Sequence, residues 1–240
     1  MRARIALIGV GGKGVRMGRS DIQKCLIPIE GVPIVEYVLE RLHECGIKLI
    51  LLLSGFHHDQ VAAYISGVSF ERSVVGQVYG GVDGENPAIC RLQSFLKGEE
   101  FIYLGGDCIF AQGVIEKLLK CAERRPDDAA IVLATSESSM APIHEHLNLD
   151  GERIVKVMAP DDPSAGSLAV MGTYYIRPKS FKFLRMVPPE NLGSAFLQKA
   201  IDAGETVSVC PVTTPWFCIH TQDDLEKWNT SPMRKFLLGL

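Results

Sequence analysis

The chain has 240 residues, of which 47% are hydrophobic, and a formal net charge of −3. This length and composition suit one domain with a sizeable hydrophobic core. The small negative charge argues against a general nucleic-acid binder, although a local basic pocket is compatible with it.

The cysteines and apolar runs bear on the compartment. The seven cysteines are scattered without a CxxC pair, which favours reduced thiols in a cytosolic protein over a disulfide framework or zinc site. The N-terminal MRARIALIGVGG reaches glycine after a very short apolar run, so it predicts a strand and no signal peptide. The apolar run at 47–53 is too short to span a bilayer. We therefore expect a cytoplasmic protein that does not contact a membrane.

The first half of the chain alternates predicted strands and helices. Proline in the first turn and glycine after the last turn delimit the first helix. The nearly continuous apolar run at 47–53 is typical of a parallel strand covered by helices on both faces. The expected strands are 4–10, 47–53, 73–79, 101–104 and 129–134, and the expected helices 33–45, 59–66, 87–96 and 113–125. The alternation predicts a doubly wound, mostly parallel, Rossmann-like α/β sheet with helices on both faces.

The pattern changes after Thr135. Asp150-Gly151 predicts the turn of an antiparallel hairpin, and Thr221 with Asp223 and Asp224 predicts a capped helix start with first-turn acids. The expected strands are 146–149, 154–157, 168–176, 206–211 and 216–220, and the expected helices 179–186, 194–203 and one from 221. This half adds an antiparallel, substrate-side subregion to the same α/β domain.

A glycine-rich loop follows the first strand. Residues 9–24 read GVGGKGVRMGRSDIQK, and glycines let backbone amides approach and cradle phosphate oxygens. Lys13, Arg16, Arg19 and Lys24 can neutralise a polyphosphate. The loop therefore predicts a site for a nucleoside triphosphate.

Other interpretations of this loop are weaker. Gly9, Gly11 and Gly14 satisfy the GxGxxG dinucleotide fingerprint. However, later prolines and glycines prevent a long helix from starting before residue 33, and the second strand ends without an acidic residue for a ribose. A Walker A loop is excluded because no GK[ST] follows at the required spacing. A glycine turn with solvated cations is the remaining alternative.

The run GGKGVRMGRSDIQKCLIPIEGVPIVEYVLERLHECGIKLILLLSG resembles the signature of the sugar-1-phosphate nucleotidyltransferase family in the nucleotidyl transferase superfamily. That signature has a GxGxRM loop, a lysine about eight residues later and an L-x-P-x-x-G-x-P stretch entering a helix. The resemblance implies transfer of a nucleoside monophosphate from a triphosphate to a sugar 1-phosphate, forming a nucleotide-sugar and pyrophosphate. It also implies one nucleotidyltransferase domain over 1–240, with a nucleotide-binding half at about 1–135 and a sugar-binding half at about 136–240.

The resemblance assigns roles to the loop cations. Arg16, matching the loop arginine, would grip the leaving β- and γ-phosphates through its fork of donors. Lys24, matching the motif lysine, would sit on the α-phosphate and the attacking phosphate. These two are the expected catalytic residues. The expected nucleotide-binding residues are Gly11, Gly12, Lys13, Gly14 and Gly84. Gly84 falls where the family places a glycine loop against the base, and a plain turn capping the next helix is an equal alternative.

A metal site is expected at Asp107. It follows a predicted strand at the carboxyl end of the sheet, and the matching family aspartate holds magnesium, a hard cation that prefers oxygen ligands. A helix cap is the alternative. The second aspartate of the family is Cys218 here, and the nearby glycine is His220.

Thiolate is a poor magnesium ligand, so a plain transfer of both family ligands fails. Strand alternation puts Cys218 and His220 on one face, which makes His220 a second candidate ligand. The expected cofactor is Mg²⁺, with Mn²⁺ as the alternative. A buried small cysteine and a core or capping histidine are the structural alternative.

The acceptor region departs from the family. Gly172 matches the glycine that lets a sugar approach the backbone, but Met158-Ala159 stands where the family often carries Glu-Lys. Acceptor recognition is therefore altered. His144, Glu145 and His146 could replace the lost charges or decorate a hairpin edge.

Two further functions remain open. The compact length and the segment SGFHHDQ also resemble phosphocholine cytidylyltransferases, whose acceptor needs aromatic or acidic groups around its ammonium. A catalytically weak paralogue that binds a nucleotide-sugar and regulates a partner is the other alternative. The expected partners are a nucleoside triphosphate and a sugar 1-phosphate, without nucleic acid or membrane. The tail 231–240 could support a homo-oligomer.

Overall fold

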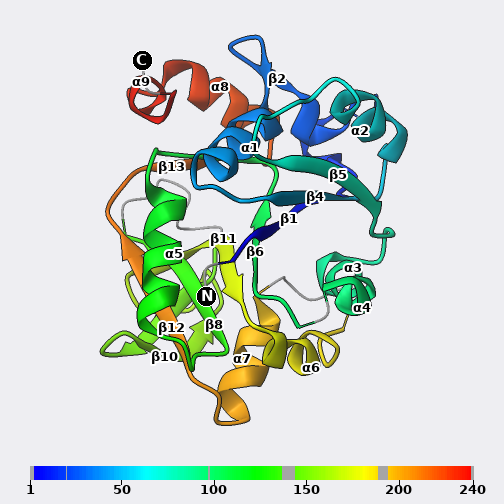
Figure 1. The fold of residues 1–240 in the computed structure, drawn as a ribbon. Coiled ribbons are helices and arrows are strands. Elements are labelled where there is room, and N and C mark those ends of the chain that lie inside the picture. The colour runs from blue at the N-terminus through cyan, green and yellow to red at the C-terminus, as the bar shows by residue number, and fades with distance from the viewer. Residues whose placement is uncertain (1–2, 20, 97, 137–143, 189–193, 239–240) are drawn as a thin grey trace.

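The computed structural model describes residues 3–19, 21–96, 98–136, 144–188 and 194–238, and is built around one nine-stranded sheet (Figure 1). Its strands, in spatial order, are β5 (Val74–Tyr79), β4 (Leu49–Ser54), β1 (Ile5–Val10), β6 (Phe101–Gly105), β11 (Leu168–Ile176), β8 (Ala130–Thr135), β12 (Val207–Val212), β10 (Arg153–Met158) and β9 (His146–Asp150). Neighbouring strands are parallel in the run β5-β4-β1-β6, and β8 is parallel to β12. Strand β11 is antiparallel to β6 and β8, and β10 is antiparallel to β12 and β9. The predicted mixed α/β sheet is confirmed.

Helices cover both faces of the sheet because side chains alternate along each strand. Ala6 and Ile8 of β1 belong to one core and Leu7 to the other. The first core also takes side chains from α1 (Ile34–Glu44), α2 (His58–Ile65), α5 (Val114–Arg124), α8 (Gln222–Thr230) and α9 (Met233–Leu238). The second takes side chains from α3 (Glu85–Arg91), α4 (Gln93–Leu96), α6 (Phe181–Leu184) and α7 (Ala195–Asp202).

Small elements outside the main sheet differ most from the expectation. The late strand expected at 216–220 is β13 (Trp216–Cys218), which pairs antiparallel with β7 (Cys108–Phe110). β7 was not predicted, nor was the hairpin of β2 (Pro28–Ile29) and β3 (Val32–Pro33). Strands of two or three residues are too short to leave an alternation pattern in the sequence.

The two halves of the chain interleave in the sheet. Strand β8, from residues before 136, lies between β11 and β12, both from residues after 136. The antiparallel strands expected from the second half are therefore part of the same layer as the parallel strands. No helix in the described part of the chain is both long and apolar enough for a membrane crossing.

A buried arginine joins these interleaved segments. Arg177, just after β11, is 6% exposed. Its Nε donates to the Glu100 carboxylate at 2.9 Å, its Nη1 to the Asp128 carbonyl at 2.9 Å and its Nη2 to the Ala122 carbonyl at 3.0 Å. The guanidinium thus links the start of β6, the end of α5 and the loop before β8.

The variant Arg177→Leu is expected to lower the free energy of unfolding by about 3 kcal/mol, because it leaves a partly buried carboxylate and two carbonyls without their hydrogen-bond donor. Urea unfolding followed by circular dichroism measures this change. The matched control is Arg72→Leu, at an exposed arginine, which should stay within about 0.5 kcal/mol of the parent. Equal stability of the two variants would contradict the role of Arg177.

Candidate functional site

A pocket of about 680 Å³ opens at the carboxyl ends of the parallel strands. Its walls include Gly9 and Val10 of β1, Leu53 of β4, Gly80 after β5 and Gly105 of β6. This is the edge of an open α/β sheet where ligands bind. The structure therefore places the pocket where the sequence predicted a ligand.

The glycine loop runs along this pocket without a long helix. In its described residues, two short 3₁₀ turns, η1 (Val15–Met17) and η2 (Lys24–Leu26), and then the β2–β3 hairpin precede α1, which starts at Ile34. Gly14 and Gly18 flank η1 with φ of 64° and 63°, a conformation that favours glycine. The expected absence of a dinucleotide-type helix is confirmed.

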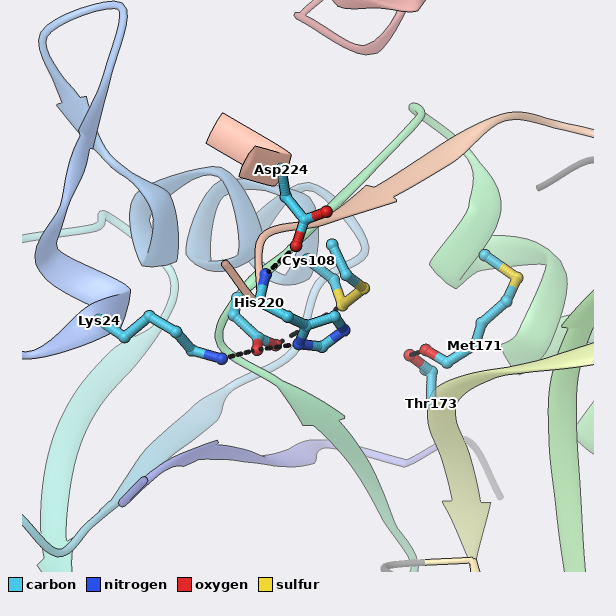
Figure 2. Close-up of a disulfide and its surroundings, with 8 residues drawn as sticks. Lys24, Cys108, Met171, Thr173, His220 and Asp224 are labelled. Carbon is cyan, nitrogen blue, oxygen red and sulfur yellow. Dashed lines mark hydrogen bonds and ion pairs between the residues drawn. A yellow bond between two sulfur atoms is a disulfide. The ribbon is translucent and has the colours of Figure 1, made fainter. Parts of the chain in front are cut away.

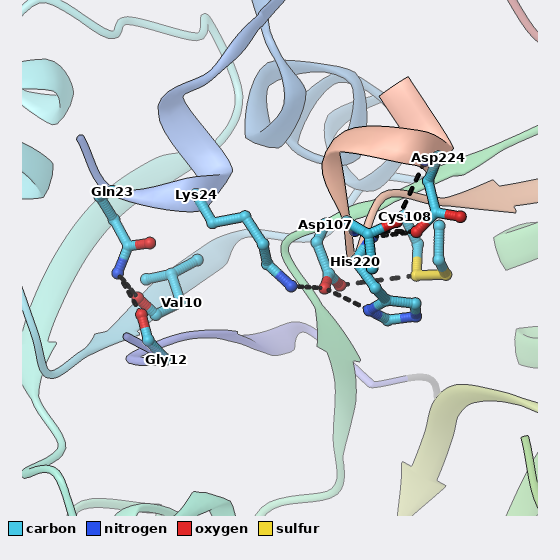
Figure 3. Close-up of polar contacts among 10 residues, drawn as sticks. Val10, Gly12, Gln23, Lys24, Asp107, Cys108, His220 and Asp224 are labelled. Atoms are coloured by element: carbon cyan, nitrogen blue, oxygen red, sulfur yellow. Dashed lines mark hydrogen bonds and ion pairs between the residues drawn. A yellow bond between two sulfur atoms is a disulfide. The ribbon is translucent and has the colours of Figure 1, made fainter. Parts of the chain in front are cut away.

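Gln23 fixes the shape of this loop. Its side chain is buried, and its Nε2 donates to the carbonyls of Val10 at 2.5 Å and Gly12 at 3.3 Å (Figure 3). The same Nε2 also donates to the Phe56 carbonyl at 3.1 Å. The backbone N–H of Gln23 donates in turn to Gln60 Oε1 at 2.7 Å. Gln23 was not predicted from the sequence, because nothing but its place beside Lys24 distinguishes it from a solvated glutamine.

The loop cations do not all face the pocket. Lys13, Arg16 and Lys24 line it, and the Lys13 ammonium lies 4.6 Å from the centroid of the Phe56 ring. Arg19 instead forms an exposed ion pair with Asp21 at 2.7 Å. The expectation that all four cations serve one polyphosphate is therefore not met for Arg19.

The glycines predicted to bind the nucleotide do not all line the pocket. Gly11, Gly12 and Gly84 line the pocket, whereas Gly14 lies outside its lining, at the start of η1. A Cβ on Gly11 would come within 3.2 Å of the Gly55 backbone nitrogen. That crowding explains a glycine where the loop crosses the end of β4.

Lys24 and Asp107 form an ion pair across the pocket (Figure 3). Both side chains are mostly buried, at 18% and 16% exposure. Burial alone would raise the pKa of Asp107, but the Lys24 ammonium and then His220 outweigh burial and hold that pKa well below its ordinary value. His220 Nδ1 lies 3.3 Å from Asp107 Oδ2. Asp107 is therefore an ionised carboxylate at neutral pH.

Cys108 and Cys218 form a disulfide beside this pair (Figure 2). The expectation of reduced thiols is wrong for these two residues. They are 110 residues apart in sequence, and β7 and β13 place them directly opposite each other. Sequence spacing gave no signal of the bond because it arises from a tertiary pairing of two short strands.

His220 follows β13 at the entrance to α8. Thr221 caps that helix: its side chain accepts from the Asp224 N–H at 3.1 Å, and the Asp224 carboxylate accepts from the Thr221 N–H at 2.8 Å and the His220 N–H at 3.0 Å. The expected helix start is confirmed, with Asp223 and Asp224 in the first turn. The cap holds the His220 backbone while its ring turns toward Asp107.

His144 lies next to His220. The ring centroids of the two histidines are 5.6 Å apart, and the His144 ring also packs edge-on against Trp216 at 4.8 Å. Burial and then the neighbouring His220 lower the pKa of His144 to about 4. The ring is therefore neutral at pH 7, and one of its two nitrogens can act as a metal ligand or a hydrogen-bond acceptor while the other carries a proton.

These residues fit magnesium only in part. Asp107 offers the carboxylate oxygen that a hard cation prefers, and Mg²⁺ is often held by one carboxylate together with substrate phosphates. Cys218 and the two imidazoles are poor magnesium ligands. The donor set suits an ion bound through Asp107 and a triphosphate, and does not form an all-carboxylate protein site.

Acidic and aromatic side chains also line the pocket. Gly172 lines it with φ of 62°, beside Glu145 and Tyr174. The Glu145 carboxylate accepts a hydrogen bond from the Ser194 hydroxyl, and burial raises the pKa of Glu145. His146 instead makes a 2.8 Å hydrogen bond with the Gly166 carbonyl and is not in the pocket lining.

Further lining residues of the pocket were not predicted. They include Glu85, Tyr103, Tyr174 and Ser194. In the sequence pattern, Tyr103 and Tyr174 resemble ordinary core positions of β6 and β11. Their rings stack, with centroids 6.3 Å apart. Only the pairing of β6 with β11 brings them to the same wall.

Comparisons with known proteins agree with this geometry. The chain is 26% identical over 234 residues to the UTP–glucose-1-phosphate uridylyltransferase of Mycoplasma genitalium, covering 78% of this chain and 76% of that protein. It superposes with a TM-score of 0.82 on the inositol-1-phosphate CTP transferase from T. maritima, at 17% identity and covering 100% and 96% of the two chains. For a UDP-glucose pyrophosphorylase complexed with UDP-glucose the TM-score is 0.80, at 16% identity and covering 95% and 99%. At these identities the structural likeness shows the fold.

The family model for MobA-like NTP transferase domains matches residues 6–170. The match covers most of β1, the glycine loop, Lys24, Asp107 and strands β2 to β10, which is more than half of the chain. The chain therefore belongs to the MobA-like NTP transferase domain family.

Proposed function

We propose that this protein transfers a nucleoside monophosphate from a nucleoside triphosphate to a sugar 1-phosphate, forming a nucleotide-sugar and releasing pyrophosphate. The observation that carries the proposal is one pocket that joins a glycine loop, the cations Lys13 and Arg16, and the Lys24–Asp107 pair. Family membership supports the triphosphate donor. The names of the relatives support the sugar 1-phosphate acceptor, and a cytoplasmic location would give access to both substrates.

The donor end of the pocket suits a polyphosphate. The backbone amides of Gly11 and Gly12 can approach phosphate oxygens because no side chain covers them. Arg16 and Lys13 would bind the β- and γ-phosphates, where negative charge increases as pyrophosphate leaves. Gly84, which also lines the pocket, would face the base.

The reacting end centres on Lys24. Attack of the sugar phosphate oxygen on the α-phosphorus brings two anions together, so the site must screen charge and hold both in line. Lys24 would place its ammonium between the α-phosphate and the attacking phosphate. In the absence of substrate that charge is balanced by Asp107. A divalent cation, Mg²⁺ or Mn²⁺, held by Asp107 would neutralise phosphate charge when bound.

The residues expected to bind the acceptor suit a polyol. Gly172, with φ of 62° and open space at its Cβ position, leaves its backbone accessible. The Glu145 carboxylate can accept hydrogen bonds from hydroxyl groups. Together they would take the place of the Glu-Lys charges that are absent at Met158-Ala159.

A second candidate acceptor is phosphocholine. Glu85, Glu145 and the stacked rings of Tyr103 and Tyr174 line the same pocket. Carboxylates and aromatic faces are the groups that recognise a quaternary ammonium. This set of side chains favours the cytidylyltransferase alternative over other acceptors without hydroxyl groups.

Pyrophosphate release should identify donor and acceptor together. The purified chain is assayed with each common triphosphate against common sugar 1-phosphates and phosphocholine, with magnesium and then manganese. Release is expected from one triphosphate with a sugar 1-phosphate. Release with CTP and phosphocholine alone would favour the second candidate, and nucleotide binding without release from any pair would favour a regulatory paralogue.

The variant Lys24→Ala is expected to lower kcat by about 100-fold, because it removes the cation that would stabilise the negative charge of the transition state. Steady-state pyrophosphate release measures the loss, and circular dichroism checks that the variant is folded. The matched control Lys48→Ala alters an exposed lysine before β4 and should leave kcat unchanged. Full activity of folded Lys24→Ala would contradict the role assigned to Lys24.

The variant Arg16→Ala is expected to lower kcat/KM for the triphosphate by about 10- to 100-fold, the equivalent of one or two charge-assisted hydrogen bonds. Arg19→Ala is the control, since Arg19 belongs to the same loop but pairs with Asp21. Initial rates at varied triphosphate concentration give both values. Equal effects of the two substitutions would show that Arg16 has no specific contact with the donor.

A further inference from the structure

Three metal-binding side chains meet beside Asp107. His144, Cys218 and His220 each offer a donor atom, and these atoms all lie within 4.8 Å of one another. Cys218 is fully buried and His220 is 15% exposed. The three come from two segments, one preceding β9 and the other at the end of β13. The fold brings them together independently of the glycine loop.

Two ring nitrogens of these histidines are buried without a hydrogen bond to any described residue: His144 Nε2 and His220 Nδ1. A buried imidazole nitrogen without a partner is unfavourable, and such groups in native proteins call for an explanation such as an ion. Nδ1 of His220 faces Asp107 Oδ2 at 3.3 Å, at the edge of the pocket. The cluster thus contains two buried nitrogens without a hydrogen bond, and one of them, His220 Nδ1, lies beside the Asp107 carboxylate.

The chemistry of this set differs from that of a magnesium site. Thiolate and neutral imidazole are ligands for zinc and similar transition metals, whereas magnesium prefers oxygen. In a tetrahedral site with metal–ligand distances of about 2.0–2.3 Å, the ligands lie roughly 3.3–3.8 Å apart. The three donor atoms all lie within 4.8 Å of one another, so small side-chain movements would bring them to these distances. Three protein ligands with one open position are typical of zinc sites that contact substrate.

The disulfide controls whether Cys218 can bind a metal. In the oxidised chain Cys218 Sγ is bonded to Cys108 (Figure 2). The Ile219 N–H donates to the Asp107 carbonyl at 2.9 Å, so backbone pairing joins β7 and β13 on its own. Breaking the sulfur–sulfur bond therefore leaves β13 in register and the thiol of Cys218 beside both histidines.

We propose that reduction of the Cys108–Cys218 disulfide creates a transition-metal site formed by His144, Cys218 and His220, and that oxidation abolishes it. A dithiol reductant breaks the bond and is oxidised to its own disulfide, while Cys108 and Cys218 each gain one electron and one proton. Metal binding then releases the Cys218 thiol proton to solvent. Disulfides in cytosolic proteins are commonly transient and redox-sensing.

The site lies where it can affect catalysis. A dication at His220 would lie next to Asp107, which otherwise pairs with Lys24. Reduction would therefore change the charge at the reacting end of the pocket. Metal binding itself does not depend on the proposed function, and only this effect on transfer rests on it.

Cobalt(II) tests the proposal through its absorption. The full chain is prepared oxidised, and again after treatment with dithiothreitol and its anaerobic removal, and each form is titrated with Co²⁺. The reduced chain is expected to bind one Co²⁺ with a thiolate-to-cobalt charge-transfer band, which added Zn²⁺ abolishes. The oxidised chain should show no such band. A reduced chain without the band, or an equal band in the oxidised chain, would overturn the proposal.

Variants assign the ligands. Cys108→Ser cannot form the disulfide and should show the band without reductant, whereas Cys218→Ser should lack it in both redox states. Adding His144→Ala to Cys108→Ser should weaken Co²⁺ binding at least 10-fold. The control is Cys121→Ser, at another buried cysteine, which should behave as the parent does. A charge-transfer band retained in Cys218→Ser would overturn the assignment.

Two further readouts keep the outcomes separate. Thermal melting identifies a variant that fails to fold, in which case the comparison of oxidised and reduced parent still decides the proposal. Pyrophosphate release is measured in both redox states. If the band appears only on reduction but no triphosphate–acceptor pair releases pyrophosphate, the metal site stands and the proposed transfer fails. If transfer occurs but the band is absent, the metal site fails.

Discussion

The ion pair between Lys24 and Asp107 is the contact on which the geometry of the pocket depends. It joins η2, at the end of the glycine loop, to the turn between β6 and β7. Both side chains are mostly buried, so each charge is compensated chiefly by the other, and loss of one leaves the other unpaired in a poorly hydrated place. The position of the loop over the sheet is thereby coupled to the position of the carboxylate.

That coupling has an electrostatic consequence for ligand binding. Lys24 and Asp107 compensate each other's charge when the pocket is empty. When a ligand binds, a phosphate anion can take the place of Asp107 beside Lys24, and its counter-cation can take the place of Lys24 beside Asp107. Each buried charge then still has a partner of opposite sign. The low pKa of Asp107 keeps this exchange available throughout the neutral range. His220 is the third member of the cluster, and it connects the pair to the disulfide and to His144.

The sequence predicted the local structure well because apolar periodicity and turn residues are local signals. Strand 168–176 was predicted with the bounds that β11 has, and the start of α8 was predicted from its capping residues. Spatial order and long-range pairing were not predicted: the Cys108–Cys218 bond needs β7, which has three residues. Arg19 was grouped with the pocket cations because spacing does not show which way a loop residue points.

The place of β11 in the sheet limits how this chain can be divided. Strand β11 lies between β6 and β8, while the family match ends at residue 170, inside that strand. A fragment cut there would expose the edges of two buried apolar strands, a template for aggregation. It would also lack Cys218 and His220. The last 70 residues are therefore not an appendage to a complete catalytic module, and insertions or fusions should be tolerated at the hairpin turn around Asp150-Gly151 rather than at the boundary of the family match.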